Sequence, residues 1–442
     1  MKRKIQAELL IWKDQAPHIP LIIRGARQVG KSHLIESFGQ AYFESVLTIN
    51  FERSPHFKTC FDHLDPVKIL NQLELLSGQA IHAGKTLLFL DEIQECPAAI
   101  QSLRYFKEEY PDLHVIGAGS LLEFALTEAD FSMPVGRVQF LYLKPLSFEE
   151  FLWALGDEKL VDYLMDFSFS SPFPSAIHQV LLEKVRLYLL LGGMPAVIQI
   201  YLDTRSIERA VQIQLALLQT YRADFSKYGR RQEYAHLETL FAKIPHHATQ
   251  QLKYSKINPD VDSRTLKGAL EKLVLAGLMI PVYQSSASGL PLSATINPRK
   301  FKMLFMDVGL MLRAQGVISP LLLSEDILFL SQGAMMEQFV GQELLAYQYP
   351  YSAPELFFWS REAKSSQAEV DYLILHGTQI LPIEVKSKSV GHLKSIKRFM
   401  EEKNAPLGIR ISEHPFSFKD QILSVPLYAI FGLQNYLSQS AS

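Results

Sequence analysis

Short apolar runs separated by amphipathic segments characterise the first third of the chain. Residues 19–24 form an apolar run that ends in a glycine turn, and the segment after it has apolar residues at helical spacing. Two more apolar runs, at 86–94 and 113–119, are typical of buried strands. Because strands alternate with helices, we predict an α/β domain with a parallel sheet over residues 1–150.

The pattern becomes helical in the middle of the chain. Residues 151–204 are predicted to form a small helical region, and residues 205–312 contain further amphipathic helices. Three of these helices are expected at 237–244, 250–258 and 262–279. Two short strands, 279–284 and 292–298, follow them and flank a tip rich in serine, glycine and proline. Three helices and a two-stranded wing predict a winged-helix module.

Residues 313–442 return to a mixture of helices and strands. Helices are expected at 333–349 and 392–405, with strands at 356–364, 368–377, 379–388, 406–412 and 422–427. Helix, three strands, helix and strand is the element order of a restriction-endonuclease-like core. We therefore predict an α/β domain of that kind at the C-terminal end.

Length, composition and charge narrow the class of protein. A chain of 442 residues with 48% apolar and 20% charged residues predicts a globular protein of two to four domains. A net charge of −2 excludes a uniformly basic coat for nucleic acid. Cys60 and Cys96 are too few for a disulfide framework, which suits a reducing compartment. The most membrane-like stretch, 187–202, is short and interrupted by glycine and proline, so we expect a soluble cytoplasmic protein without a membrane partner.

A phosphate-binding motif lies at the first glycine turn. The segment from Gly25 to Ser32 has the G-x4-G-K-S spacing, between a predicted strand and a predicted helix. Its backbone N–H groups are expected to face phosphate oxygens, with Lys31 at the outer phosphates and the Ser32 hydroxyl on Mg²⁺. The candidate nucleotide-binding residues are Gly25, Gln28, Val29, Gly30, Lys31, Ser32 and His33.

Polar residues at the ends of later strands are candidate catalytic groups. Asp91 ends the second apolar run, and we expect its strand to lie beside the phosphate-loop strand, so that Asp91 holds Mg²⁺ through water. Glu92 is expected to polarise the attacking water. Ser120 has two interpretations, a sensor of the outer phosphate or a helix cap. Arg137 also has two: an arginine finger, acting in the same chain or on a neighbouring one, or a surface arginine.

The stretches RGARQVGKS, LLFLDEIQ, GAGS and GRVQFLYLKPLSFEEF together resemble a large group of prokaryotic AAA-type ATPases. The C-terminal half of those proteins is a domain of unknown function with a restriction-endonuclease-like core. The resemblance implies ATP as the nucleotide, a helical lid over residues 151–204 and a relationship to ATPases that act as switches. The residues by themselves fit any P-loop NTPase.

The C-terminal strands carry a second set of candidate residues. Asp371 on one strand and Glu384 on the next are expected to share a divalent cation, with Glu337 completing the shell and Lys386 acting on a bound water or the phosphate. The spacing resembles the PD-(D/E)XK nuclease motif, although no proline precedes Asp371. The alternative is a buried Glu384–Lys386 ion pair without catalysis.

Two functions are compatible with these patterns. In the first, Mg-ATP binding and hydrolysis control a nuclease-like domain that acts on DNA or RNA. In the second, a nucleotide-switched regulatory or scaffold ATPase retains that domain as a non-cleaving binding module. Basic residues on the third winged-helix helix, Arg264, Lys267 and Lys272, fit either DNA contact or packing against the ATPase domain. A homo-oligomer is compatible with both functions.

Overall fold

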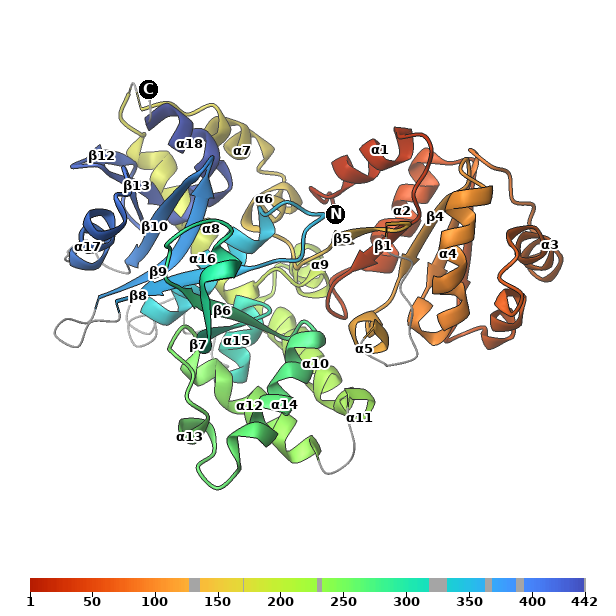
Figure 1. The fold of residues 1–442 in the computed structure, drawn as a ribbon. Helices are drawn as coiled ribbons and strands as arrows, with labels where there is room; N and C mark the ends of the chain where they lie inside the picture. The colour runs from red at the N-terminus through yellow and green to blue at the C-terminus, as the bar shows by residue number, and fades with distance from the viewer. Residues whose placement is uncertain are drawn as a thin grey trace. The chain divides into compact units, whose positions relative to one another are not determined.

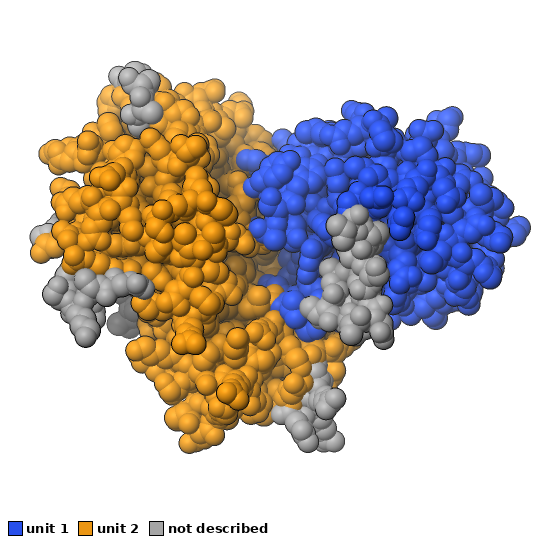
Figure 2. All heavy atoms as spheres, viewed as in Figure 1, with its two compact units in different colours: residues 1–144, 275–277, 349–353 blue, residues 145–274, 278–348, 354–442 orange. Residues whose placement is uncertain are grey.

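The computed structural model describes residues 1–126, 136–169, 171–228, 233–317, 332–361, 368–386 and 393–440. The chain divides into two compact units, coloured separately in Figure 2. Unit 1 contains residues 1–144, 275–277 and 349–353, and unit 2 contains residues 145–274, 278–348 and 354–442.

A five-stranded parallel sheet forms the centre of unit 1, as the alternating pattern predicts. Its strands are β1 (Leu21–Arg24), β2 (Ser45–Asn50), β3 (Thr86–Asp91), β4 (His114–Ala118) and β5 (Gln139–Tyr142). The order is β2-β3-β4-β1-β5. The expectation that the Asp91 strand adjoins the phosphate-loop strand is wrong, because β4 lies between β1 and β3. Crossover connections allow a later strand to insert between two earlier ones, and the apolar pattern does not record this order.

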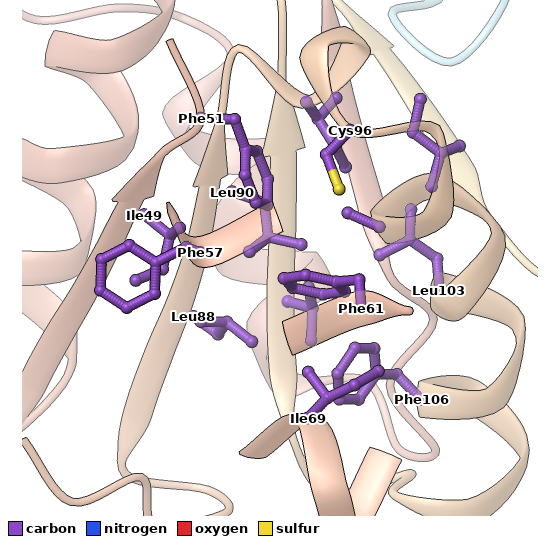
Figure 3. Packing of buried hydrophobic residues seen from close by; sticks show 14 of the residues in the cluster. Ile49, Phe51, Phe57, Phe61, Ile69, Leu88, Leu90, Cys96, Leu103 and Phe106 are labelled. Carbon is purple, nitrogen blue, oxygen red and sulfur yellow. The ribbon is translucent and has the colours of Figure 1, made fainter. Parts of the chain in front are cut away.

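Helices accompany the sheet of unit 1 (Figure 1). They are α1 (Gln6–Asp14), α2 (Lys31–Tyr42), α3 (Pro66–Ser77), α4 (Pro97–Glu109) and α5 (Leu122–Leu126), with short 3-10 turns η1 (Pro55–Phe61) and η2 (Ile93–Glu95). Figure 3 shows part of the core on one side of this sheet, where Phe61 of η1 and Phe106 of α4 belong to the same buried cluster as Leu88 and Leu90 of β3. This core fixes the carboxyl ends of the strands, where the polar candidates lie.

Unit 2 begins with a long helical region. Its helices are α6 (Phe148–Leu155), α7 (Glu158–Met165), α8 (Ser175–Leu191), α9 (Pro195–Thr204), α10 (Ile207–Ala223), α11 (Phe225–Tyr228), α12 (Tyr234–Lys243), α13 (Tyr254–Ile257), α14 (Ser263–Leu275) and α15 (Val308–Ala314). Within the described ranges, no single helix is long and apolar enough to cross a membrane. The pair α8 and α9 meets the length and composition criteria only jointly, and it is bent by 119°.

An eight-stranded sheet completes unit 2, with α16 (Gln332–Ala346), α17 (Lys394–Lys403) and α18 (Leu433–Ser440) around it (Figure 1). The strands are β6 (Met279–Ser285), β7 (Ile296–Phe305), β8 (Leu356–Ser360), β9 (Glu369–His376), β10 (Gln379–Lys386), β11 (Gly408–Ser412), β12 (Ser417–Lys419) and β13 (Ile422–Pro426). Their order is β12-β13-β11-β10-β9-β8-β6-β7. The predicted order of helix, three strands, helix and strand is present in α16 to β11.

The predicted wing extends this sheet. β6 and β7 form the expected antiparallel hairpin, although β7 begins at Ile296, after a 3-10 turn at 292–295. β6 also pairs in parallel with β8, through Val282 and Leu356 among others. Parallel pairing satisfies the backbone groups along β6, so the hairpin is not a free-standing wing. The winged-helix and restriction-endonuclease-like classes remain predictions.

Candidate functional site

The loop between β1 and α2 has the backbone conformation that its glycines permit. Gly25 has φ = 148° and Gly30, which precedes the first residue of α2, has φ = 94°. A Cβ at Gly25 would lie 2.2 Å from the carbonyl oxygen of Leu143, so no larger residue fits there. The non-glycine Gln28 also has a positive φ, of 66°. The loop therefore holds a tightly wrapped backbone at the start of a helix.

Lys31 lies folded back over this loop. Its ammonium donates hydrogen bonds to the carbonyl oxygens of Gly25 and Ala26, both at 2.8 Å. Burial lowers the pKa of Lys31 to about 8, an effect that the nearby carboxylates of Glu92 and Asp91 partly oppose. An ammonium held in the loop by two neutral carbonyl groups is available to a stronger anionic partner.

Asp91 receives two side-chain hydrogen bonds at the end of β3. The Ser32 hydroxyl donates to Asp91 Oδ1 at 3.1 Å, and the Asn50 amide donates to Oδ2 at 2.8 Å. Burial raises the pKa of Asp91, and the hydrogen bond from Asn50 opposes this shift. Asn50 ends β2 directly opposite Asp91 in the parallel ladder. The register of the sheet therefore places Asn50 where it can orient the Asp91 carboxylate toward Ser32.

Glu92 is held at the other side of the same sheet edge. Its Oε2 accepts hydrogen bonds from the Ser120 N–H at 3.3 Å and the Ser120 hydroxyl at 3.2 Å. The Gln94 amide donates to the same oxygen at 2.7 Å. Glu92 has φ = 49°, a left-handed conformation that is uncommon for glutamate. Ser120 thus contacts a candidate catalytic carboxylate, which neither of its two predicted roles anticipated.

The remaining candidates of unit 1 lie in different surroundings. Val29 is fully buried, and its carbonyl oxygen accepts a hydrogen bond from Arg3 at 3.1 Å. His33 is exposed on α2. Arg137 donates from Nε to Glu108 on α4 at 3.0 Å, and the side chain is 43% exposed. The observed partner of Arg137 is therefore an exposed acid.

Sequence reasoning missed three residues of this region. Asn50 had a usable signal, because it is a polar residue directly after a strand pattern, like Asp91. Gln94 and Arg3 had no usable sequence signal. Gln94 reaches Glu92 only because of the local backbone turn, and Arg3 contacts Val29, which is distant in sequence.

The oxygen donors at this sheet edge fit a magnesium ion. The Ser32 hydroxyl and the Asp91 carboxylate lie within hydrogen-bond distance of each other, and both are hard oxygen ligands of the kind Mg²⁺ prefers. Within the described ranges, the side chains that donate hydrogen bonds to the buried Asp91 carboxylate, Ser32 and Asn50, are both uncharged.

The four nuclease-like candidates meet in unit 2. β9 and β10 pair up to Ile383–Tyr372, which places Glu384 beside Asp371 at the end of the ladder. The Val385 N–H donates to Asp371 Oδ2 at 2.8 Å, and Lys386 Nζ lies 2.5 Å from Glu384 Oε1. Glu337 reaches the same cluster from α16.

A lysine that the sequence did not indicate lies at the centre of this cluster. The Nζ of Lys302, on β7, is 2.8 Å from Glu337 Oε1, 2.8 Å from Glu369 Oε1 and 3.8 Å from Asp371 Oδ1. Burial by itself would lower the pKa of Lys302, but the carboxylates of Glu337, Asp371 and Glu369 raise it above the ordinary value. Lys302 therefore remains charged. We name this set, with Glu384 and Lys386, the Lys302 cluster.

The pKa values of Glu337, Glu384 and Asp371 in the Lys302 cluster are all raised, so these acids do not readily lose all their protons at once. Burial raises the pKa of Glu337, and the neighbouring Asp371 raises it further. Burial likewise raises the pKa of Glu384, again with a contribution from Asp371. For Asp371, burial raises the pKa, while Lys302 and the Val385 N–H oppose the shift. Like charges in a dry site favour retention of protons.

The Lys302 cluster does not fit the divalent cation expected at Asp371 and Glu384. An ammonium already lies between the carboxylates of Glu337 and Asp371. Among the described residues, no group of three or more histidine, cysteine, aspartate or glutamate side chains is arranged to hold a metal ion.

Three family models match successive parts of the chain. Residues 18–152 match an AAA domain. Residues 182–320 match a domain of unknown function, DUF8612, and residues 332–430 match another, DUF4143. The comparison with curated proteins found no match.

The comparison with solved structures gives matches of low sequence identity, including the following three. The Walker-type ATPase PABY2304 of Pyrococcus abyssi has 15% identity and a TM-score of 0.43, covering 71% of this chain and 95% of that one. The Aeropyrum pernix ORC1 protein in complex with DNA has 12% identity and a TM-score of 0.30, with coverages of 71% and 92%. The Thermotoga maritima RuvB Holliday junction branch migration motor has 13% identity and a TM-score of 0.30, with coverages of 68% and 91%.

The assignment of unit 1 rests on the matched family model and on local geometry. The matched residues contain the wrapped glycine loop, the parallel sheet and the Ser32–Asp91 contact. The chain therefore carries an AAA-type P-loop ATPase domain in residues 18–152.

Proposed function

We propose that the chain binds and hydrolyses Mg-ATP at the carboxyl ends of the strands of the unit 1 sheet. The single observation that carries this proposal is the Ser32–Asp91 hydrogen bond of 3.1 Å beside the Lys31 ammonium. Backbone N–H groups from Gly25 to Ser32 bind the phosphates, and Lys31 leaves its carbonyl partners for the outer phosphate oxygens. Val29 supports the loop from within the core, Gln28 is part of the loop, and His33 follows it on α2.

Each carboxylate has a separate role in this proposal. Ser32 and Asp91 hold the magnesium ion, which neutralises charge on the phosphates when it is bound. Glu92 accepts a proton from the attacking water as general base, after exchanging its bonds to Ser120 and Gln94 for that water. In this proposal Ser120 and Gln94 hold the Glu92 carboxylate in position until the nucleotide is in place.

We propose further that nucleotide state controls unit 2, and that unit 2 is a binding module that does not cut nucleic acid. The Lys302 cluster favours this choice over a metal-dependent nuclease, because an ammonium takes the space between the carboxylates. DNA, RNA and a protein are all compatible with such a module; nucleic acid is the first class to test, because the motif resembles that of nucleases.

A direct assay tests both proposals. ATP binding and phosphate release are measured for the wild type, for Lys31→Ala and for Lys68→Ala, whose side chain is 62% exposed on α3. We expect turnover to be lost in Lys31→Ala alone. Plasmid, linear and single-stranded substrates are then incubated with Mg²⁺ or Mn²⁺, with and without ATP, beside Asp371→Ala. Cleavage that disappears in Asp371→Ala would overturn the non-cleaving role, and ATP binding that survives Lys31→Ala unchanged would overturn the ATPase site.

A further inference from the structure

Lys302 lies on β7, at one edge of the eight-stranded sheet, and its ammonium contacts acids on β9 and α16. Lys302 is 2% exposed, and its ammonium lies 5.0 Å from the centre of the Phe358 ring on β8. The side chain is thus buried, with its charged end against the Phe358 ring of β8. A buried stem and an aromatic face fix the position of the charge.

Hydrogen bonds already occupy most of the oxygens around this ammonium. Glu337 Oε1 and Glu369 Oε1 contact Lys302, each at 2.8 Å. The Gln251 amide donates to Glu369 Oε2 at 2.8 Å, and the Val385 N–H donates to Asp371 Oδ2 at 2.8 Å. These donors come from separate parts of unit 2, so the arrangement is held from several sides.

One oxygen of the Lys302 cluster stands apart. Glu384 is 6% exposed, and its Oε2 is a buried acceptor with no hydrogen-bond partner among the residues that the structure describes. Its other oxygen contacts Lys386 at 2.5 Å. A divalent cation such as Mg²⁺ or Ca²⁺ requires six or more oxygen ligands, water included, so this single oxygen does not make a site for it.

We propose that the Lys302 ammonium is the resident cation of this cluster and that it excludes divalent metal from it. The ammonium neutralises buried carboxylates, as a metal ion would, but it presents N–H donors where a metal presents empty coordination positions. It therefore has no position at which to activate water. This inference deepens the proposed non-cleaving role of unit 2 and is independent of ATP hydrolysis in unit 1.

The first test counts bound metal in folded protein that retains Lys302. Nucleotide-free full-length chain is titrated with Mn²⁺, and free ion is measured by electron paramagnetic resonance for the wild type and for Asp371→Asn. Metal at the ATPase site contributes equally to both. We expect the same number of bound ions in the two proteins. One ion fewer in Asp371→Asn would overturn the proposal.

The second test removes the ammonium. Lys302→Met preserves much of the side-chain length without the charge, and Lys302→Met/Asp371→Asn is its matched control. We expect Lys302→Met to bind one more Mn²⁺ than the control, and to gain several degrees in melting temperature on adding Mn²⁺ where the control gains none. An equal number of ions in the two variants would show that Lys302 is not what excludes the metal. If Lys302→Met does not fold, the first test decides by itself.

Discussion

The Ser32 hydroxyl lies 3.1 Å from Asp91 Oδ1, although 59 positions separate the two residues in the chain. The contact joins the first turn of α2 to the end of β3, across the strand that lies between β1 and β3. Asn50 fixes the other Asp91 oxygen at 2.8 Å. The orientation of the proposed magnesium ligand Asp91 therefore depends on a residue at the start of a helix, Ser32, and a residue at the end of a strand, Asn50.

Asn50→Ala should weaken catalysis without removing the loop. Without the amide, the buried Asp91 carboxylate loses its Oδ2 donor and turns more freely. We expect the Mg²⁺ concentration needed for half-maximal ATP hydrolysis to rise about 10-fold, within the range typical of outer-shell metal partners. Asn71→Ala, in α3, is the control. An unchanged Mg²⁺ dependence would contradict the orienting role.

Glu92→Gln should separate binding from hydrolysis. The amide keeps the size of the side chain but cannot accept the proton of water, so we expect hydrolysis to fall roughly 100-fold or more while ATP affinity stays within a few-fold. Single-turnover phosphate release and equilibrium ATP titration measure the two quantities. Glu95→Gln, a 46% exposed neighbour, serves as control. Loss of affinity together with hydrolysis would assign Glu92 to binding.

Gly25→Ala should destabilise unit 1 and abolish ATP binding. The new Cβ would lie 2.2 Å from the Leu143 carbonyl oxygen, at a φ of 148°. Gly84→Ala is the matched control, because Gly84 also has a positive φ, of 77°, but nothing lies within 4 Å of the added atom. We expect a cost of about 1 kcal/mol for Gly84→Ala and clearly more for Gly25→Ala, measured by urea unfolding. Equal costs would rule out the steric explanation.

Arg137→Ala distinguishes the two interpretations of that residue. In the structure Arg137 pairs with Glu108 at an exposed position. We therefore expect ATP hydrolysis to change less than about twofold, since exposed ion pairs contribute little. The assay is run at protein concentrations from nanomolar to micromolar. A fall of about 1000-fold or more at one or more of these concentrations would identify Arg137 as an arginine finger.

Stability of unit 2 should fall as pH rises through the neutral range. Burial raises the pKa of Glu343 from 4.5 to about 8, with further contributions from Glu149 and Glu150, while the Phe148 N–H and the Tyr347 hydroxyl oppose the shift. The folded state holds this proton more tightly than the unfolded chain, so its contribution is complete below about pH 4.5 and is lost by about pH 8.

The Glu343→Gln variant isolates this contribution. A neutral amide cannot ionise, so we expect a smaller loss of stability between pH 5 and 8 than in the wild type, by at least about 1 kcal/mol. Urea unfolding followed by circular dichroism at several pH values measures it. Glu355→Gln, at an exposed position, is the control. Parallel pH profiles for wild type and Glu343→Gln would refute the prediction.

The sequence predicted best those features that depend on neighbouring residues. The glycine loop and the strand-end position of Asp91 follow from local spacing, and both are present. The place of β4 between β1 and β3 does not follow from it, because sheet order is set by how crossovers pack. Asn50 becomes meaningful only once its strand is known to pair with the Asp91 strand.

Lys302 shows why the second site could not be predicted in full. Lys300 and Lys302 alternate with apolar residues on β7, a pattern typical of a solvent-facing strand edge. Lys302 is nevertheless buried, because Glu337 and Phe358 from other elements surround its side chain. Burial of this kind depends on contacts made after the sheet has assembled, and the strand's own pattern contains no sign of them.

The parallel pairing of β6 with β8 has a consequence for how the chain can be divided. β6 and β7 fall within residues 182–320, and β8 to β13 fall within residues 332–430, so two separately described sequence regions build one sheet. A fragment starting at residue 332 would present the bare edge of β8, with Phe357 and Phe358 on it, to other molecules. Such a fragment should aggregate on expression. Both regions are therefore needed to complete the sheet, and a graft of either onto another protein would have to carry both.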